Sequence, residues 1–299
     1  MKIVVIGGGL VGRLVQHAVP EAEIYDWRPA PVREGLDVTH PPTFGAMYLW
    51  KQIPGITSAP VSIHTKIDLQ EPTPERILAY KEKVGKQSDM GDWATQFIPR
   101  TEGYRIASMA APRIHYHSFV ERIDWEEKRI QLRGRKRTIP YDQLVSTIPL
   151  YSFLKMVGRA WPGEPLMRPI FVNIVPKCPV LLPANTWLVN YWSNGLMKPY
   201  RSTFRDGTTH EESLSSWGPG SKSIVPGKIY VTDGQADALA GLRVWLADRS
   251  IYVFGRYGTW LPDELLHNTW ECIDSWRQAN ATKPPTTSDR PSSATNVQP

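Results

Sequence analysis

A glycine-rich turn between a short apolar run and a helical pattern constrains this chain more than any other feature. Residues 2–6 predict a buried strand, and apolar residues at helical spacing over 10–18 predict a helix that Pro20 ends. The turn reads G-x-G-x-x-G, a pattern that lets the backbone approach a pyrophosphate at a helix N-terminus. The candidate contacts in it are Gly7, Gly9, Leu10, Val11 and Gly12.

An acidic residue follows the second predicted strand, residues 23–27. Asp26 stands 19 residues after Gly7, where a carboxylate can accept hydrogen bonds from the ribose hydroxyls of an adenosine. An acid there disfavours a 2′-phosphate, so FAD or NAD fits better than NADP. Trp27 and Arg28 are further candidate contacts. Strand, helix and strand in this order predict a parallel sheet. The alternative to a nucleotide-binding motif is an ordinary glycine turn of an α/β protein that binds no nucleotide.

The remaining elements follow from periodicity and capping signals. Thr73 is a candidate N-cap. His115 and His117 would share one face of a strand, where they would form either a metal-binding pair or part of an ordinary polar face. No third ligand is in view, so we expect no metal. The patterns predict helices at 73–84, 233–247 and 270–278, strands at 114–119, 144–149 and 251–254, and a hairpin at 121–132.

Charge and composition limit the classes of binding partner that this chain can have. With 35 Lys and Arg against 29 Asp and Glu, the formal net charge is +6, which permits a polyanionic partner. A basic run is either a solvated turn or a nucleic-acid contact: Arg133, Arg135, Lys136 and Arg137. Two cysteines exclude a disulfide scaffold and a cysteine-built zinc site. No run of eighteen apolar residues occurs, so we expect no membrane span. Arg13 follows the apolar opening after only a short run and no A-x-A cleavage site is nearby, so we expect no signal peptide and a cytoplasmic location.

Three further segments carry a resemblance to a known family. They are residues 119–124 with 141–150 (FVERID and YDQLVSTIPL), residues 200–204 (YRSTF) and residues 251–260 (IYVFGRYGTW). Together with the glycine-rich opening, the chain resembles the FAD-binding superfamily of amine oxidases, protoporphyrinogen oxidase and UDP-galactopyranose mutase. The resemblance implies an α/β fold with a Rossmann-like FAD-binding domain, a parallel sheet with a hairpin, and a smaller, mostly β substrate domain.

The resemblance also implies roles for single residues. Val120 would contact adenine through its backbone, and the strand ending at Thr147 would return the chain to the substrate domain. Gly255 and Arg256 would lie by the pyrophosphate of a non-covalent FAD. A capped helix beginning at Asn268 and Thr269 would point its N-terminus at the flavin. In mutase-like relatives, the segment with Tyr200 and Arg201 faces the active site, so Arg201 would clamp a substrate anion or, alternatively, form an ion pair.

We therefore predict an FAD-binding domain from residues 1–40, 101–150 and 228–279, a substrate region from 41–100 and 151–227, and a disordered tail at 280–299. The leading function is an FAD-dependent oxidoreductase that moves a hydride from a small-molecule substrate to flavin N5. The alternatives are a reduced-flavin mutase for a nucleotide-linked sugar, a flavoenzyme for an amine-bearing modified nucleobase, and a non-catalytic dinucleotide-binding module.

Overall fold

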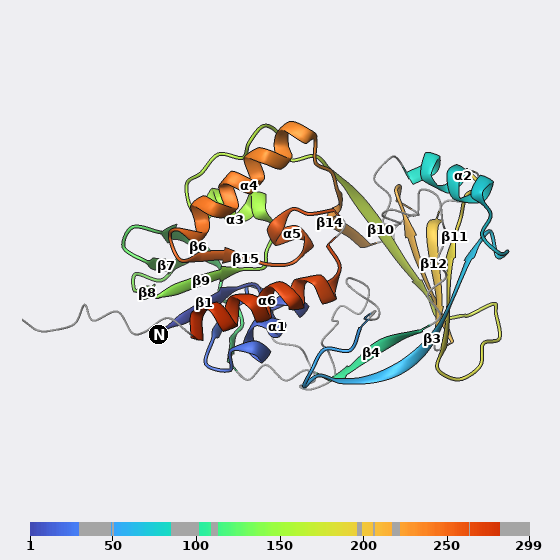
Figure 1. Ribbon diagram of the computed structural model, residues 1–299, viewed down its shortest axis with the longest axis horizontal. Coiled ribbons are helices and arrows are strands. Elements are labelled where there is room, and N and C mark those ends of the chain that lie inside the picture. Colours follow the sequence, from blue (N-terminus) through green and yellow to red (C-terminus); the bar gives the residue numbers. More distant parts are fainter. Residues whose placement is uncertain are drawn as a thin grey trace, which may run out of the picture.

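A computed structural model describes residues 1–29, 49, 51–84, 102–108, 113–195, 199–205, 207–216, 222–262 and 264–281. Of the tail predicted at 280–299, residues 280 and 281 are the end of the last helix and residues 282–299 lie outside the described residues. The described elements form two parts that lie side by side, one built on a five-stranded sheet and the other on a seven-stranded sheet (Figure 1).

The five-stranded sheet is parallel throughout and confirms the predicted βαβ opening. Its order is β15 (Ile251–Val253), β9 (Gln143–Ser146), β1 (Ile3–Ile6), β2 (Glu23–Tyr25) and β5 (Ile114–His115). All four residues of β1 are buried, which a parallel sheet requires because helices cover both of its faces.

Alternate residues of β1 enter two different cores. Ile3 and Val5 pack with α1 (Leu10–Ala18) and α6 (Leu266–Ala281) on one face. Val4 and Ile6 pack on the other face with α3 (Leu150–Met156), α4 (Asp233–Ala247) and a three-stranded sheet. That small sheet consists of β6 (Val120–Asp124), β7 (Arg129–Leu132) and β8 (Thr138–Pro140), and its first two strands are the predicted hairpin.

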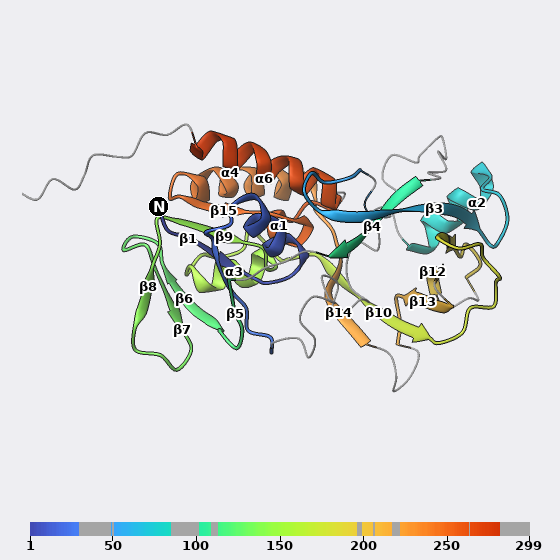
Figure 2. The same ribbon diagram turned by 90° about the horizontal axis from the view of Figure 1, so that it is seen from below.

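The seven-stranded sheet confirms the mostly β second part. Its order is β14 (Lys222–Ile229), β10 (Met167–Val175), β13 (Thr208–Ser213), β12 (Pro199–Arg205), β11 (Thr186–Tyr191), β3 (Thr57–Ile67) and β4 (Glu102–Ser108). Helix α2 (Pro74–Val84) packs on it through Ile77 and Tyr80, against a core that contains Trp187 and Tyr191. Figure 2 shows the same two parts from below.

One boundary differs from the predicted division. β4 was assigned to the nucleotide-binding part, but it pairs antiparallel with β3 and lies in the seven-stranded sheet. Residues 102–108 therefore belong to the other part. Local sequence does not reveal this, because the pairing partner lies some forty residues earlier in the chain.

Two local predictions were wrong. His115 and His117 do not share a strand face, since β5 ends at His115 and His117 has a left-handed backbone with φ 55°. His115 instead stacks on Tyr25, and no metal-ligand cluster occurs among the described residues. The last helix begins at Leu266, four residues before the predicted start. Asn268 is therefore inside the helix, where its Oδ1 accepts a hydrogen bond from the backbone N–H of Leu265.

No helix within the described ranges is long and apolar enough to cross a membrane.

Candidate dinucleotide site

The carboxyl ends of four parallel strands meet at one edge of the five-stranded sheet. The registers align Ile6 with Tyr25 and Ser146, and Ser146 with Val253. The residues that follow these strands are Gly7, Asp26, Thr147 and Phe254, so three predicted site segments and the Gly255 segment lie on one edge. In open α/β sheets this edge is where ligands bind.

The glycine-rich turn is packed too closely for any side chain at Gly12. A Cβ there would lie 1.9 Å from the carbonyl oxygen of Gly7, and Gly12 therefore lets α1 lie directly against the end of β1. Gly9 is the opposite case, since a Cβ there would meet nothing within 4 Å. The turn is thus closed toward the sheet and open above Gly9, which is the shape that a pyrophosphate needs.

The N-terminus of α1 has no side-chain cap in the described part of the chain. Its N-cap is Gly9, which has no side chain to accept a hydrogen bond from the first turn. The N–H groups of the first helical residues, Leu10, Val11 and Gly12, have no partner within the helix. No acidic residue occupies the first turn, so the positive end of the helix dipole faces the open space above Gly9.

Asp26 lies directly beneath this turn and is almost fully buried, with 1% of it exposed. Its Oδ2 accepts a hydrogen bond from the N–H of Gly8 at 2.6 Å and from Nη2 of Arg28 at 2.5 Å. Its Oδ1 accepts from the backbone N–H and Nε of Arg28, at 2.9 and 3.0 Å. Burial alone would raise the pKa of Asp26, but the hydrogen bonds and charge of Arg28 outweigh it and lower that pKa.

The carboxylate therefore fixes the turn through the N–H of Gly8. The bidentate pair also raises the pKa of Arg28, through the hydrogen bond to Asp26. Arg13 reaches the same region from α1: its Nε donates to the carbonyl of Gly8 at 3.4 Å and its Nη2 to the hydroxyl of Tyr116 at 3.1 Å. Sequence reasoning missed Arg13, although its position in the first turns of the helix was a usable signal. Trp27 is 63% exposed.

Thr147 joins β9 to the glycine-rich turn. Its backbone N–H donates to the carbonyl of Ile6 at 3.0 Å, and its hydroxyl donates to the carbonyl of Gly7 at 3.0 Å. Val120 is buried at the start of β6, and Ser118 just before it donates its N–H to the carbonyl of Asp26 at 2.8 Å. The start of the hairpin therefore lies next to the end of β2, where an adenine contact was predicted.

The C-terminal segment meets the same turn. Gly255 has φ +83° and faces Val11, whose Cγ2 a Cβ on Gly255 would approach to 2.9 Å. Arg256 begins the short helix α5 (Arg256–Thr259), and its Nε is buried without a hydrogen-bond partner in the part of the chain that the structure describes. An unpaired guanidinium donor beside a helix N-terminus is suited to an anionic group.

Thr269 plays a structural part. Its hydroxyl donates to Oε1 of Glu264 at 2.5 Å, and the hydroxyl of Thr259 donates to the other oxygen of the same carboxylate. Glu264 thus connects α5 to α6, a role that the sequence did not suggest. Asn268 is exposed near the start of α6, and nothing described at this position tests its predicted relation to the flavin.

Tyr200 and Arg201 lie in the seven-stranded sheet, apart from the strand edge. Both interact with Glu212 on the neighbouring strand: the tyrosine hydroxyl contacts Oε2 at 2.5 Å, and Nη2 of Arg201 forms an ion pair with Oε1 at 2.5 Å. The buried Lys228 lies 4.7 Å from the ring centroid of Tyr200. Arg201 therefore forms an ion pair, and an incoming substrate anion would compete with Glu212 for it.

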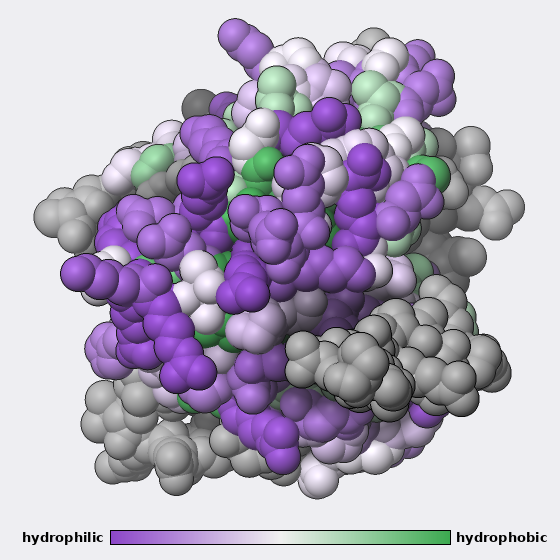
Figure 3. All heavy atoms as spheres, turned by 90° about the vertical axis from the view of Figure 1, so that its left-hand side faces the viewer, coloured by the Kyte–Doolittle hydropathy of each residue, from purple (hydrophilic) through white to green (hydrophobic). Residues whose placement is uncertain are grey.

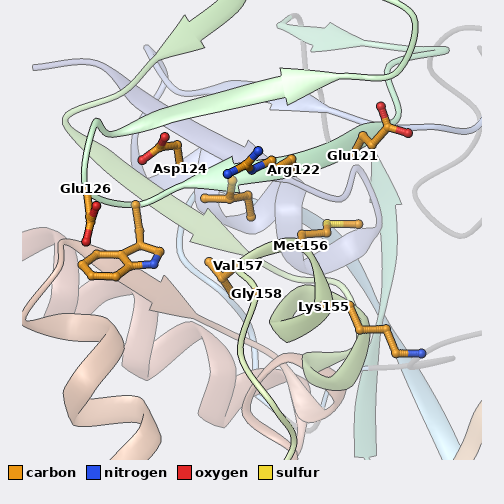
Figure 4. Close-up of a pocket in the computed structure, with 10 residues that line it drawn as sticks. Glu121, Arg122, Asp124, Glu126, Lys155, Met156, Val157 and Gly158 are labelled. Atoms are coloured by element: carbon orange, nitrogen blue, oxygen red, sulfur yellow. The ribbon is translucent and has the colours of Figure 1, made fainter.

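A cavity of about 640 Å³ lies elsewhere, between β6 and the end of α3 (Figure 4). Its walls include Trp125 and Asp124 from the hairpin and Lys155 and Gly158 from α3 and the turn that follows it. None of the predicted cofactor residues lines it, so the strand edge and not this cavity is the candidate cofactor site.

Comparisons with known proteins agree on the fold. No family profile and no curated protein matches the sequence. Among solved structures, reduced UDP-galactopyranose mutase superposes with a TM-score of 0.57 at 14% identity, over 94% of this chain and 96% of the other. A CLA-producing fatty acid isomerase from P. acnes gives 0.53 at 10% identity, over 93% and 98%.

A third protein, from Exiguobacterium sp. 255-15 and assigned as a protoporphyrinogen oxidase, gives a TM-score of 0.50 at 10% identity, over 93% of this chain and 99% of the other. Each similarity extends over both parts of the molecule and almost the whole of each relative. The expected architecture is thus confirmed: this chain has the same two-part fold as these three structures, with a Rossmann-like parallel sheet beside a mostly antiparallel one.

Proposed function

We propose that this protein binds FAD non-covalently at the strand edge and is an FAD-dependent oxidoreductase. The observation that carries the proposal is the cradle itself. A turn that is closed at Gly12 and, among the described residues, open above Gly9 lies at an uncapped helix N-terminus. Gly255, the residue before Arg256, faces Val11 of the same helix. The fold adds support, because the motifs that resemble the FAD-binding superfamily are the ones that build this cradle.

The residues present fit the dinucleotide half of FAD. The N–H groups at the start of α1 and the guanidinium of Arg256 would bind the pyrophosphate. Asp26, which Arg28 holds in place, would face the ribose, and the backbone at Val120 would border the adenine. Both oxygens of Asp26 already accept hydrogen bonds from Gly8 and Arg28, so ribose hydroxyls would take the place of side-chain donors of Arg28. The pKa lowered by Arg28 keeps the carboxylate ionised at neutral pH.

When bound, FAD would supply the acceptor for a hydride from a substrate C–H bond next to nitrogen or oxygen. The chain would contribute position and exclusion of water. The substrate would lie between the strand edge and the seven-stranded sheet, whose buried polar side chains include Glu212 and Lys228.

The absorption spectrum tests this proposal. Protein incubated with FAD and desalted should retain the two visible bands of oxidised flavin at close to one flavin per chain. Gly12→Ala should remove them, because its Cβ cannot fit beside Gly7. Gly241→Ala on α4, where a Cβ meets nothing within 4 Å, is the matched control and should retain them. A colourless wild-type protein would refute the proposal.

A second candidate is a reaction without net redox change on a nucleotide-linked sugar. It is supported by the structural similarity to reduced UDP-galactopyranose mutase over 94% of this chain. This function predicts turnover only after dithionite reduction, with no oxidant consumed. Turnover with oxidised flavin alone, or a substrate that bleaches the flavin, would favour the oxidoreductase instead.

A third candidate is a flavoenzyme that acts on an amine-bearing modified nucleobase. It draws support from a basic surface on the hairpin, considered next. It predicts that a nucleic acid with the modified base bleaches the flavin, whereas the unmodified strand binds without bleaching it.

A further inference from the structure

A row of cations extends from the β7–β8 turn to the end of α4. The turn holds Arg135, Lys136 and Arg137, all exposed. Arg137 is followed by Thr138, whose hydroxyl accepts a hydrogen bond from Nη1 of Arg129 at 3.3 Å. This contact links the turn to the neighbouring strand and to the next basic residue along the row.

The row continues from the hairpin onto α4. Lys128, next to Arg129, donates from its Nζ to the hydroxyl of Ser250 at 3.4 Å. Ser250 follows Arg249, whose guanidinium lies 4.8 Å from the ring centroid of Trp125 and 4.1 Å from that of Trp245. The contacts thus join the hairpin to the end of α4 without a gap.

Arg159 closes the row at its far end. Its guanidinium also lies 4.1 Å from the centroid of Trp245, so one indole contacts two guanidiniums. We call this surface the cationic row: Lys128, Arg129, Arg135, Lys136, Arg137, Arg159 and Arg249.

The charge of this row is not neutralised within the described ranges. None of its seven cations forms an ion pair there, whereas the adjacent Arg133 pairs with Glu121. The exposed Glu126 and Glu127 of the hairpin turn form no ion pair with these cations either. In addition, Nε of Arg249 is buried with no hydrogen-bond partner. Figure 3 shows this end of the molecule, where the described surface is largely hydrophilic.

We propose that the cationic row binds the phosphate backbone of a nucleic acid. Five of its seven cations are arginines, whose planar guanidiniums bind phosphate oxygens in pairs. The indoles hold two of these guanidiniums in place, which reduces the entropy lost on binding. Nη1 of Arg249 also donates to the carbonyl of Trp245 at 3.1 Å. The row contains no residue of the cofactor cradle, so this inference does not depend on FAD binding.

Fluorescence anisotropy with labelled single-stranded and duplex DNA of about 20 nucleotides tests the proposal, measured from about 50 to about 200 mM salt. The variant is Arg135→Gln with Arg137→Gln. Its matched control is Arg168→Gln with Lys177→Gln, two exposed cations of β10 and the loop after it, with the same change in net charge. Circular dichroism and the Tm without FAD establish that both variants fold.

The expected result follows from counterion release. Each lost contact should reduce the slope of log Kobs against log salt by about 0.7 for a single strand and 0.9 for a duplex. Two contacts correspond to about 25-fold weaker single-strand binding at 0.1 M salt. The control should bind like the wild type, and Arg159→Gln should reduce the slope by about 0.7 for a single strand.

Several outcomes would overturn the proposal. These are no measurable binding by the wild type, an equal loss in the turn variant and its control, or an unchanged slope for Arg159→Gln. Polyglutamate that competes as strongly as DNA of equal charge would show a general polyanion surface, and it too would reject the nucleic-acid assignment. A protein that binds DNA but no flavin would refute only the proposed function.

Discussion

The ion pair between Asp26 and Arg28 offers the sharpest test of the cradle. Asp26→Asn preserves the shape of the side chain but removes its negative charge. In the wild type, Oδ1 accepts hydrogen bonds from the backbone N–H and Nε of Arg28. Oδ2 accepts from Nη2 of Arg28 and from the N–H of Gly8. One of these oxygens becomes an NH₂ group, which cannot accept. The variant therefore loses hydrogen bonds to a buried site and leaves a half-exposed guanidinium without its partner.

The magnitude follows from those contacts. Hydrogen bonds to charged groups contribute roughly 1.5–3 kcal/mol each, and solvent around Arg28, whose side chain is 35% exposed, reduces this. We expect the free energy of unfolding to fall by about 2 kcal/mol. An unfolding entropy of about 2.1 cal/mol/K per residue over the chain converts this to a decrease in Tm of about 3 °C.

The pH dependence separates this mechanism from a general packing defect. The folded pKa of Asp26 is lowered, so its stabilisation is complete above the unfolded value of about 3.9 and is lost as the pH falls through the folded pKa. Thermal unfolding followed by circular dichroism, without added FAD, should show a constant difference in Tm between wild type and variant from about pH 8 to pH 5. The difference should shrink below about pH 4.

Asp237→Asn, at an exposed position of α4, is the control and should leave Tm unchanged at every pH. A difference in Tm for Asp26→Asn of less than about 1 °C at pH 7 would refute the stabilising role of the pair. A difference that persists unchanged below about pH 4 would show that the amide perturbs packing and not charge.

Other predictions concern capping, glycine packing and the cofactor. Thr232→Ala should lower the free energy of unfolding by about 1 kcal/mol, because Thr232 forms a capping box with Gln235 at the start of α4, and urea titration measures this; an unchanged midpoint would contradict it. Gly12→Ala should destabilise the protein by about 1–3 kcal/mol, because its Cβ would overlap the backbone of Gly7; Gly241→Ala should instead stabilise α4 by up to about 1 kcal/mol, and the same titration compares them. Arg256→Gln should weaken FAD binding by about tenfold or more in a fluorescence titration. The Tm without FAD should change little, because Nε of Arg256 has no hydrogen-bond partner to lose among the described residues. An accompanying decrease in Tm would assign Arg256 a structural role.

Local sequence patterns predicted the elements whose structure depends on residues close together in the chain. Apolar spacing identified α1, and α4 extends from Asp233 to Ala247 as predicted, with its capping box at the start. The glycine-rich turn is equally local, because G-x-G-x-x-G fixes where backbone can pack against backbone. Buried apolar runs also identified β1 and β9, since strands in the middle of a parallel sheet are covered on both faces.

The sequence analysis also missed two local features near the start of α6. The start of α6 was placed four residues late because Asn268 resembles an N-cap, whereas here it accepts from Leu265 within the first turn. Glu264 gained its role by contacting Thr259 and Thr269.

The sequence by itself determined the first strand, the glycine-rich turn and the first helix, since these are consecutive in the chain. Only the tertiary structure placed Gly255 against Val11, aligned β4 with the seven-stranded sheet and joined Lys128 to the end of α4. The physical reason is that these contacts depend on side-chain packing and strand pairing between segments far apart in the chain, whose energies no local pattern encodes.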